Sequence, residues 1–225
     1  MRIGIICALE KEISLLREYF VVEIEHHCGS VHVVEASMFS NSLFLTISGV
    51  GKTCAAIAAQ ALISQMKCDI IINTGLAGGC SPLLTQGCAV LISGAIYHDF
   101  HTSGLTVGDD NHLFLSNERL NSRAKEILAA EGLGYTTGIA ASGDTFVMDS
   151  RNRDDIVART GCICVDMELA AIAHVASLTS TPYISLKIIS DNADEDSVSD
   201  FLFNLDIYSS YCSSFVYSLV KEISY

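Results

Sequence analysis

Apolar residues in this 225-residue chain gather in short continuous runs, and the segments between many of them repeat apolar positions with a helical period. Runs such as 69–73, 89–93 and 183–189 are apolar almost throughout, which is typical of strands covered on both faces. The pattern predicts strands at 2–8, 20–27, 31–37, 42–48, 69–74, 88–97, 135–141, 162–165 and 183–190. It predicts helices at 10–19, 51–66, 117–131, 149–159, 167–178 and 199–222.

Strands outnumber helices early in the chain and then alternate with them, which predicts an α/β fold with a mixed central sheet between helices. Half of the residues are hydrophobic and only 17% are charged, so the chain can bury a large core. No stretch has the composition of a flexible linker, and residues 104–117 are expected to form a surface loop. We therefore expect one domain over residues 1–225.

Composition also limits the partners of the chain. The formal net charge of −13 argues against a nucleic-acid partner, because phosphate binding needs clustered Lys and Arg. No apolar stretch approaches the roughly 20 residues of a membrane span, so no membrane association is expected. The nine cysteines are odd in number and contain no C-x-x-C pair, which favours a reducing, cytoplasmic compartment.

Two acidic segments follow apolar, strand-like runs: Asp166-Met167-Glu168 and Ser190-Asp191. A carboxylate at the end of a buried strand lies at the sheet edge where α/β proteins bind ligands. Partial burial also makes its pKa adjustable, as general acid and base catalysis requires. Together with the early Glu12, these acids predict a pocket that hydrolyses a bond at a sugar carbon.

Three other motifs are weaker. Gly49-Val50-Gly51-Lys52-Thr53 lies between a strand and a helix, but a phosphate-binding P-loop needs glycine where Thr46 stands. A nucleoside triphosphatase is therefore disfavoured. The glycines of 75–79 lack the spacing of a dinucleotide-binding turn. They follow the predicted strand 69–74 and are expected to let the backbone approach a ligand or a neighbouring strand. His98 and His101 form an H-x-x-H pair without a further ligand, so neither a metal nor an organic cofactor is expected.

In their order along the chain, these residues resemble the 5′-methylthioadenosine/S-adenosylhomocysteine nucleosidases of the purine nucleoside phosphorylase superfamily. The resemblance covers nearly the whole length. It is carried by Ala8-Leu9-Glu10-Lys11-Glu12, Ser48-Gly49-Val50-Gly51-Lys52, Asp69 to Gly75, Ala77-Gly78-Gly79, Tyr97-His98-Asp99, Ser142-Gly143-Asp144, Asp166-Met167-Glu168 and Ile189-Ser190-Asp191.

The resemblance implies a nucleoside phosphorylase-like domain with a twisted mixed sheet, a homodimer, and hydrolysis of a purine nucleoside that releases adenine. It implies Asp191 as the general acid at N7 of the purine, Glu12 as the residue that activates water, and Glu168 as the ligand of the ribose hydroxyls. Phe146 would stack on the base. The substrate-binding residues implied are Val50, Leu76, Ala77, Phe146, Val147, Met167 and Ser190.

The chain departs from the family pattern at several positions. Leu76 stands where serine is usual, Lys187 where arginine is common, and Cys7 replaces a glycine near Glu12. The segment after Asp99, which in the family helps to enclose the 5′ substituent, is shortened and altered. A bulkier substrate such as 6-amino-6-deoxyfutalosine, from menaquinone biosynthesis, is therefore an alternative to methylthioadenosine. A nucleoside-binding protein with impaired catalysis is another.

The phosphorylases of this superfamily bind phosphate through arginine side chains. Here the strand before the glycine turn ends in Ile72-Asn73-Thr74, and no arginine occurs between residues 18 and 118. Phosphate would bind poorly without a guanidinium group or a cluster of lysines. The sequence therefore favours water as the nucleophile.

Overall fold

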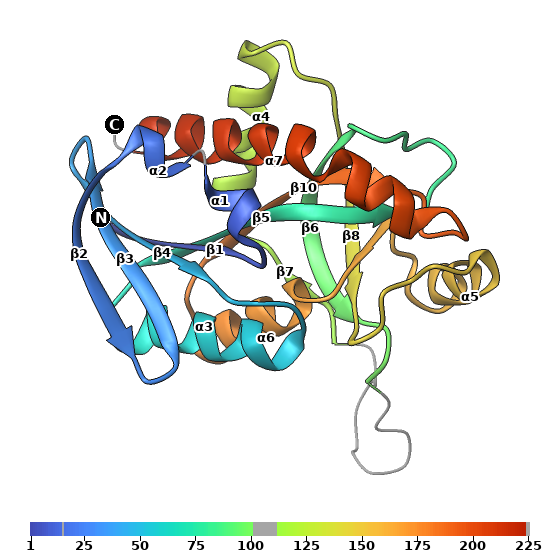
Figure 1. The fold of residues 1–225 in the computed structure, drawn as a ribbon, viewed down its shortest axis with the longest axis horizontal. Coiled ribbons are helices and arrows are strands. Elements are labelled where there is room, and N and C mark those ends of the chain that lie inside the picture. The colour runs from blue at the N-terminus through green and yellow to red at the C-terminus, as the bar shows by residue number, and fades with distance from the viewer. Residues whose placement is uncertain (15, 101–111, 224–225) are drawn as a thin grey trace.

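A ten-stranded mixed sheet forms the centre of the computed structural model, which describes residues 1–14, 16–100 and 112–223 (Figure 1). Its strands are β1 (Arg2–Cys7), β2 (Val21–Cys28), β3 (Val31–Met38), β4 (Asn41–Ile47), β5 (Ile70–Gly79), β6 (Ala89–Tyr97), β7 (Phe114–Leu115), β8 (Tyr135–Ser142), β9 (Cys164–Asp166) and β10 (Tyr183–Asp191). The helices are α1 (Glu10–Ser14), α2 (Leu16–Tyr19), α3 (Lys52–Ser64), α4 (Glu118–Ala130), α5 (Ser150–Thr160), α6 (Leu169–Leu178) and α7 (Ser197–Glu222).

The sheet has an open part and a closed part. In the open part, β1 pairs in parallel with β5 and β4, and the antiparallel strands β3 and β2 extend the sheet to its edge. In the closed part, β5 pairs with β10, β10 with β6, β6 with β8, β8 with β9, and β9 returns to β5. The ends of β5, β9 and β10 therefore lie close together.

Helices cover both faces of the sheet, as the sequence predicted. On one face the long helix α7 packs against β5 and β10, with α1, α2 and α4 beside it (Figure 1). On the other face α3 and α6 pack against each other and against the strands. Two large hydrophobic clusters fill the space between these layers and the sheet. This arrangement confirms the predicted single α/β domain with a mixed central sheet.

The glycine-rich segment 75–79 corrects one prediction, because strand β5 continues through it to Gly79 instead of ending at residue 74. Pairing explains the difference: Ala77 and Gly78 pair with β10, while Gly78 and Gly79 pair with β9. A Cβ atom on Gly78 would lie 3.0 Å from a carboxylate oxygen of Asp191, and one on Gly75 would lie 2.7 Å from a carboxylate oxygen of Glu12. The missing side chains leave room for two acids beside the strand.

Several element boundaries also differ from the predictions, and three of these differences lie close to the predicted site residues. The helix expected at 10–19 is divided into α1 and α2, and residue 15 between them lies outside the described residues. The strand predicted at 162–165 is β9, which begins only at Cys164, so Cys162 precedes it. The helix predicted from 167 begins at Leu169, whose backbone N–H donates a hydrogen bond to Asp166 Oδ2 at 3.1 Å. Met167 and Glu168 therefore lie between strand and helix.

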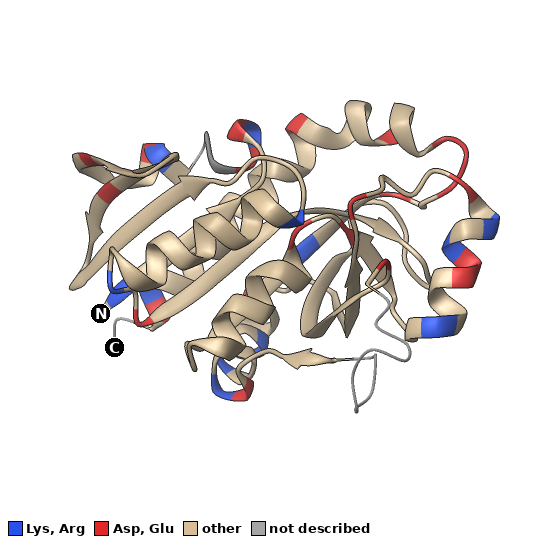
Figure 2. Cartoon of the chain, turned by 90° about the horizontal axis from the view of Figure 1, so that it is seen from below, with Lys and Arg blue, Asp and Glu red and all other residues tan. Residues whose placement is uncertain are grey.

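The loop predicted at 104–117 contains the short strand β7, which pairs with β6. Residues 101–111, including His101 of the H-x-x-H pair, lie outside the described residues. Lys and Arg positions are scattered among acidic ones in Figure 2 and do not form one basic face. Over the described part of the chain, no helix combines the length and the apolar character needed to cross a bilayer.

Candidate active site

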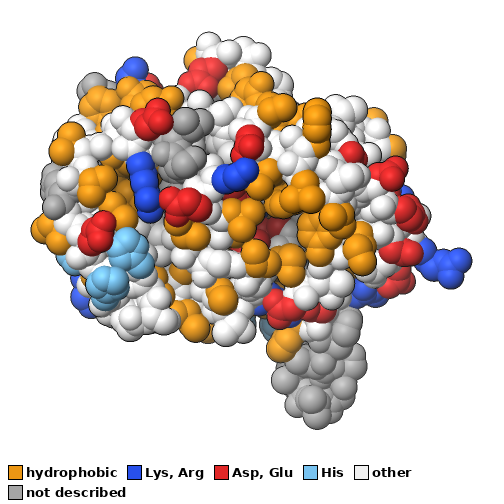
Figure 3. All heavy atoms as spheres, viewed as in Figure 1, with side chains coloured by type: hydrophobic (Ala, Val, Ile, Leu, Met, Phe, Trp, Pro, Cys, Tyr) orange, Lys and Arg blue, Asp and Glu red, His pale blue; other side chains and the backbone are white. Residues whose placement is uncertain are grey.

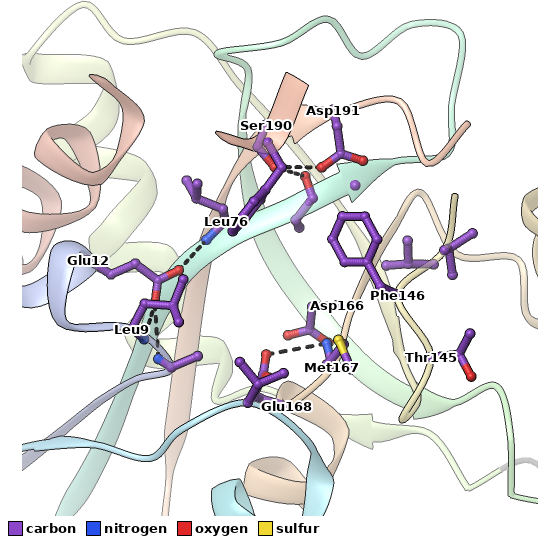
Figure 4. A pocket seen from close by; sticks show the side chains of 17 residues that line it. Leu9, Glu12, Leu76, Thr145, Phe146, Asp166, Met167, Glu168, Ser190 and Asp191 are labelled. Carbon is purple, nitrogen blue, oxygen red and sulfur yellow. Dashed lines mark hydrogen bonds between the residues drawn. The ribbon is translucent and has the colours of Figure 1, made fainter. Parts of the chain in front are cut away.

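A cavity of ≈ 200 Å³ opens where β5, β9 and β10 end, and several of its acids face one another (Figure 4). In the space-filling view, hydrophobic side chains border a recess with acidic side chains inside it (Figure 3). The structure brings all ten predicted site residues into this one cavity: Glu12, Val50, Leu76, Ala77, Phe146, Val147, Met167, Glu168, Ser190 and Asp191.

Glu12 reaches the cavity from helix α1 and is only 3% exposed. Its Oε2 accepts hydrogen bonds from the backbone N–H groups of Ala8 at 3.0 Å and Leu9 at 2.9 Å, and its Oε1 accepts one from Leu76 at 3.0 Å. Burial raises the pKa of Glu12, while the nearby Lys187 and these three N–H groups act in the opposite direction. The contacts hold the carboxylate in one orientation at the cavity wall.

Asp191 is the last residue of β10 and is 2% exposed. Its Oδ2 accepts a hydrogen bond from Ser190 Oγ at 2.7 Å, and its Oδ1 accepts one from the Ala193 N–H at 3.0 Å. Burial raises the pKa of Asp191, and these hydrogen bonds oppose the shift without cancelling it. A carboxyl group in this environment retains a proton at higher pH than a solvated aspartate does.

Glu168 precedes helix α6 and points into the cavity. Its Oε1 accepts a hydrogen bond from the Gly51 N–H at 2.8 Å, so the turn before α3 contacts the site directly. Burial and the adjacent charge of Asp166 raise the pKa of Glu168 to about 7. Its charge therefore changes close to neutral pH.

An ion pair buried behind these acids was not among the predicted site residues. Lys187 Nζ lies 2.8 Å from Asp166 Oδ2, and both side chains are 2% exposed. Asp166 also accepts a hydrogen bond from the Ser142 hydroxyl. Burial lowers the pKa of Lys187, but Asp166, Glu168 and Glu12 outweigh it and raise this pKa above its usual range. Lys187 therefore remains charged and compensates part of the negative charge of the site.

Apolar groups form the opposite wall of the cavity. Phe146 and Val147 enter from the loop between β8 and α5, and Met167 lies beside Glu168 (Figure 4). The Phe146 ring meets the ring of Phe201 from α7 edge-on, with centroids 5.9 Å apart. Such a wall, facing polar groups that converge from the other side, suits a flat heterocycle attached to a sugar.

Seven further residues line the cavity but were not predicted as site residues: Ala8, Leu9, Gly78, Thr145, Val165, Asp166 and Phe201. Three of them, Gly78, Thr145 and Asp166, are next to predicted residues in the chain. Asp166 could have been included because it ends an apolar strand-like run, as Asp191 does. Phe201 carried no such signal, since its apolar helix position is equally typical of a core residue.

The chain as a whole is similar to several known proteins. The family model described as Phosphorylase superfamily matches residues 2–221. The 5′-methylthioadenosine/S-adenosylhomocysteine nucleosidase of Actinobacillus succinogenes is 31% identical over 229 residues, covering 99% of this chain and 100% of that protein. Among solved structures, the nucleosidase of Neisseria meningitidis with bound methylthio-immucillin-A has a TM-score of 0.93 and 30% identity, covering 98% of each chain.

A second solved structure is equally similar in fold. The native futalosine hydrolase of Helicobacter pylori strain 26695 has a TM-score of 0.94 and 25% identity, covering 99% of this chain and 98% of that one. The fold and the site thus define an N-glycosidic hydrolase of the phosphorylase superfamily. Within the superfamily, the chain belongs to the 5′-methylthioadenosine/S-adenosylhomocysteine nucleosidases.

Proposed function

We propose that the chain hydrolyses the N-glycosidic bond of 5′-substituted adenosines, including methylthioadenosine and S-adenosylhomocysteine, and releases adenine. The observation that carries this proposal is the convergence of three buried carboxyl groups, from Glu12, Glu168 and Asp191, on one cavity with an apolar wall. Each group has different partners and therefore suits a different step.

Asp191 is the general acid in this proposal. Cleavage of the C1′–N9 bond moves an electron pair onto the purine, and a proton from Asp191 to N7 neutralises that charge. The raised pKa of Asp191 favours the protonated form that this step needs. The same cleavage leaves positive charge on the ribose, which the ionised groups of the cavity stabilise.

Glu12 orients the water that attacks C1′, and Glu168 accepts hydrogen bonds from the ribose hydroxyls. Three backbone donors fix the carboxylate of Glu12, which restricts the positions that its water can take. The water adds its oxygen to C1′ and passes a proton to Glu12. Phe146 stacks on the adenine, and Val147 reads the edge of the base through its backbone.

Water is the proposed nucleophile, as the sequence suggested. None of the described residues that line the cavity is lysine or arginine. The buried cation Lys187 is already paired with Asp166 at 2.8 Å. A phosphate ion in the cavity would therefore lack the charge-assisted hydrogen bonds that it needs.

The second candidate substrate is 6-amino-6-deoxyfutalosine, cleaved by the same chemistry. The high structural similarity to a futalosine hydrolase supports it. The altered segment after Asp99, on which this alternative also rests, lies largely outside the described residues.

Free adenine measured by chromatography tests both candidates. The purified protein is incubated separately with methylthioadenosine, S-adenosylhomocysteine and aminofutalosine, with and without phosphate. Adenine formed without phosphate establishes hydrolysis, and the order of kcat/KM identifies the substrate. Binding of all three without adenine release would contradict the proposal and favour the nucleoside-binding protein.

A homodimer is also part of the proposal. Helix α3 is apolar nearly all round, yet its Ile57 side chain is 47% exposed. The side chain of Leu115 on β7 is 70% exposed. Helix α6 packs against both elements, so these residues belong to one side of the molecule. A second copy of the chain would cover them. Sedimentation velocity checks this: a monomer at micromolar concentration would contradict the proposal.

The proposed compartment is the cytoplasm. All nine cysteines are free thiols in the structure, and several, such as Cys7 and Cys212, are fully buried. Free thiols in this number suit a reducing environment. Fractionation of cells that express the protein checks the location.

A further inference from the structure

Three charged residues connect separate segments beside the cavity, close in the chain to its lining residues Val50 and Thr145. Lys52 begins helix α3, Asp99 follows strand β6, and Asp144 lies in the loop between β8 and α5. Lys52 Nζ lies 2.5 Å from Asp99 Oδ1 and 3.5 Å from Asp144 Oδ2. We call these three residues the mouth clasp.

The clasp also holds the backbone of two of these segments. The Asp144 N–H donates a hydrogen bond to Asp99 Oδ2 at 2.8 Å, and the Lys52 N–H donates one to Asp144 Oδ1 at 2.9 Å. The approach is close enough that a Cβ atom on Gly51 would lie 3.2 Å from Asp144 Oδ1. Gly51 has φ 99°, which glycine adopts without strain. The turn before α3 is therefore held against the loop after β8.

Each of these two segments carries part of the site. Gly51, next to Lys52, donates its N–H to Glu168 at 2.8 Å, and Val50 lines the cavity. Phe146 and Val147 follow Asp144 closely in the chain and also line the cavity. The clasp therefore connects the segment that supports the ribose side with the loop that supports the base side.

The side chains of Lys52 and Asp99 are 20% and 29% exposed, and that of Asp144 is 54% exposed. Burial acts to raise the pKa of Asp99, but the hydrogen bonds from Lys52 and the Asp144 N–H lower it below its usual range. Asp99 therefore stays ionised at neutral pH. Ion pairs near a surface contribute little to overall stability, so the clasp matters mainly through the segments that it positions.

We propose that Lys52, Asp99 and Asp144 are positioning residues that hold the ribose-side turn and the base-side loop at the spacing a nucleoside requires. This inference rests on the proposed function, because it takes the bound ligand to be a nucleoside. When the clasp is broken, the two segments are no longer held in place in the free protein. They must then become ordered when the ligand binds, and the free-energy cost of this ordering reduces the affinity. The loss falls on binding more than on the chemical step.

The test measures the dissociation constant of 5′-methylthiotubercidin by calorimetry, together with KM and kcat for adenine release. Its 7-deaza base lacks the N7 proton acceptor, so this analogue reports binding without turnover. We expect Asp99→Ala and Lys52→Met each to weaken binding and raise KM by about tenfold, with kcat changed less than about twofold. Lys52→Arg keeps the positive charge and is expected to restore most of the affinity.

Glu35→Gln is the matched control, because Glu35 pairs with His26 at 2.6 Å with similar exposure, on strand β3. It should leave affinity and KM unchanged. Unaltered affinity in Asp99→Ala, or an equal loss of affinity in Glu35→Gln, would contradict the positioning role proposed for the mouth clasp. If the wild-type protein binds the analogue but releases no adenine, the proposed function fails and the affinity series alone decides the clasp. If it does neither, both proposals are overturned.

Discussion

Two lysine–aspartate pairs lie next to the cavity in very different surroundings: one is buried behind its acids, which we call the floor, and the other belongs to the mouth clasp. On the floor, Lys187 and Asp166 are both 2% exposed and lie 2.8 Å apart. At the mouth, Lys52 and Asp99 are 20% and 29% exposed and lie 2.5 Å apart. The two pairs have similar geometry, but breaking them has different consequences. Only on the floor would the remaining charge be buried away from water, which strongly destabilises the folded protein.

The comparison separates two tasks within one site. The floor sets the charge and the pKa values of the acids, since Lys187 and Asp166 both act on Glu168. The mouth sets the distance between segments that join the site from different parts of the chain. Changes on the floor should thus affect folding and chemistry, and changes at the mouth should affect binding.

The largest effect is expected for Asp191, the proposed general acid, which lies inside the cavity itself. Asp191→Asn keeps the shape of the side chain but removes the proton donor, so adenine release should fall by about 10²–10⁴-fold. Affinity for 5′-methylthiotubercidin and the thermal midpoint should change little. Initial rates measure adenine release, and calorimetry measures the affinity and the thermal midpoint. Asp196→Asn, at the exposed start of α7, is the control, and wild-type rates in Asp191→Asn would remove this residue from the mechanism.

Breaking the buried pair tests the floor as a structural element. Lys187→Met leaves Asp166 without its cation, and the free energy of unfolding should fall by about 3–5 kcal/mol. Urea titration measures this loss. Lys187→Arg retains the charge and should lose much less. A Lys187→Met protein as stable as the wild type would show that the buried Asp166 does not need a cation beside it.

The charge of Glu168 provides a pH test of the floor. The pKa of Glu168 is raised to about 7, so its side chain becomes ionised as the pH rises through this value. The ionised form is the one that accepts hydrogen bonds from the ribose hydroxyls. Affinity for 5′-methylthiotubercidin should therefore be about tenfold weaker at pH 6 than at pH 8. Glu168→Gln, titrated by calorimetry over the same range, should bind weakly with little pH dependence. An equally steep dependence in that variant would assign the titration to another group.

The smallest effect is expected at the mouth. Lys52→Met should lower the free energy of unfolding by less than about 1 kcal/mol, because partly exposed ion pairs stabilise folded proteins only weakly. Urea titration alongside Lys187→Met compares the two lysines directly. If both variants lost the same stability, the distinction between floor and mouth would be wrong.

Much of the fold could be predicted because its signals are local. Continuous apolar runs indicated most of the strands, and the mixture of strands and helices indicated the layered α/β class. The boundaries failed where long-range pairing overrides local preference. Strand β5 continues through its glycines because β9 and β10 pair with them and two acids need the space.

The candidate site could be predicted only in part. Residues 12, 168 and 191 were selected because the family pattern relates them, and the structure places all three in one cavity. Asp166 and Lys187 were missed as a pair because nothing in the local sequence relates β9 to β10. The mouth clasp was missed for the same reason, since its members come from three separate segments.

The sequence by itself determined which segments become strands and helices, and which chemical groups stand at their ends, because these depend on neighbouring residues. The tertiary structure decided which of those groups meet and how strongly each holds its proton. Glu168 illustrates the division: its position after β9 is local, but its pKa of about 7 depends on burial and on Asp166. Burial and charge proximity arise only when distant parts of the chain pack together.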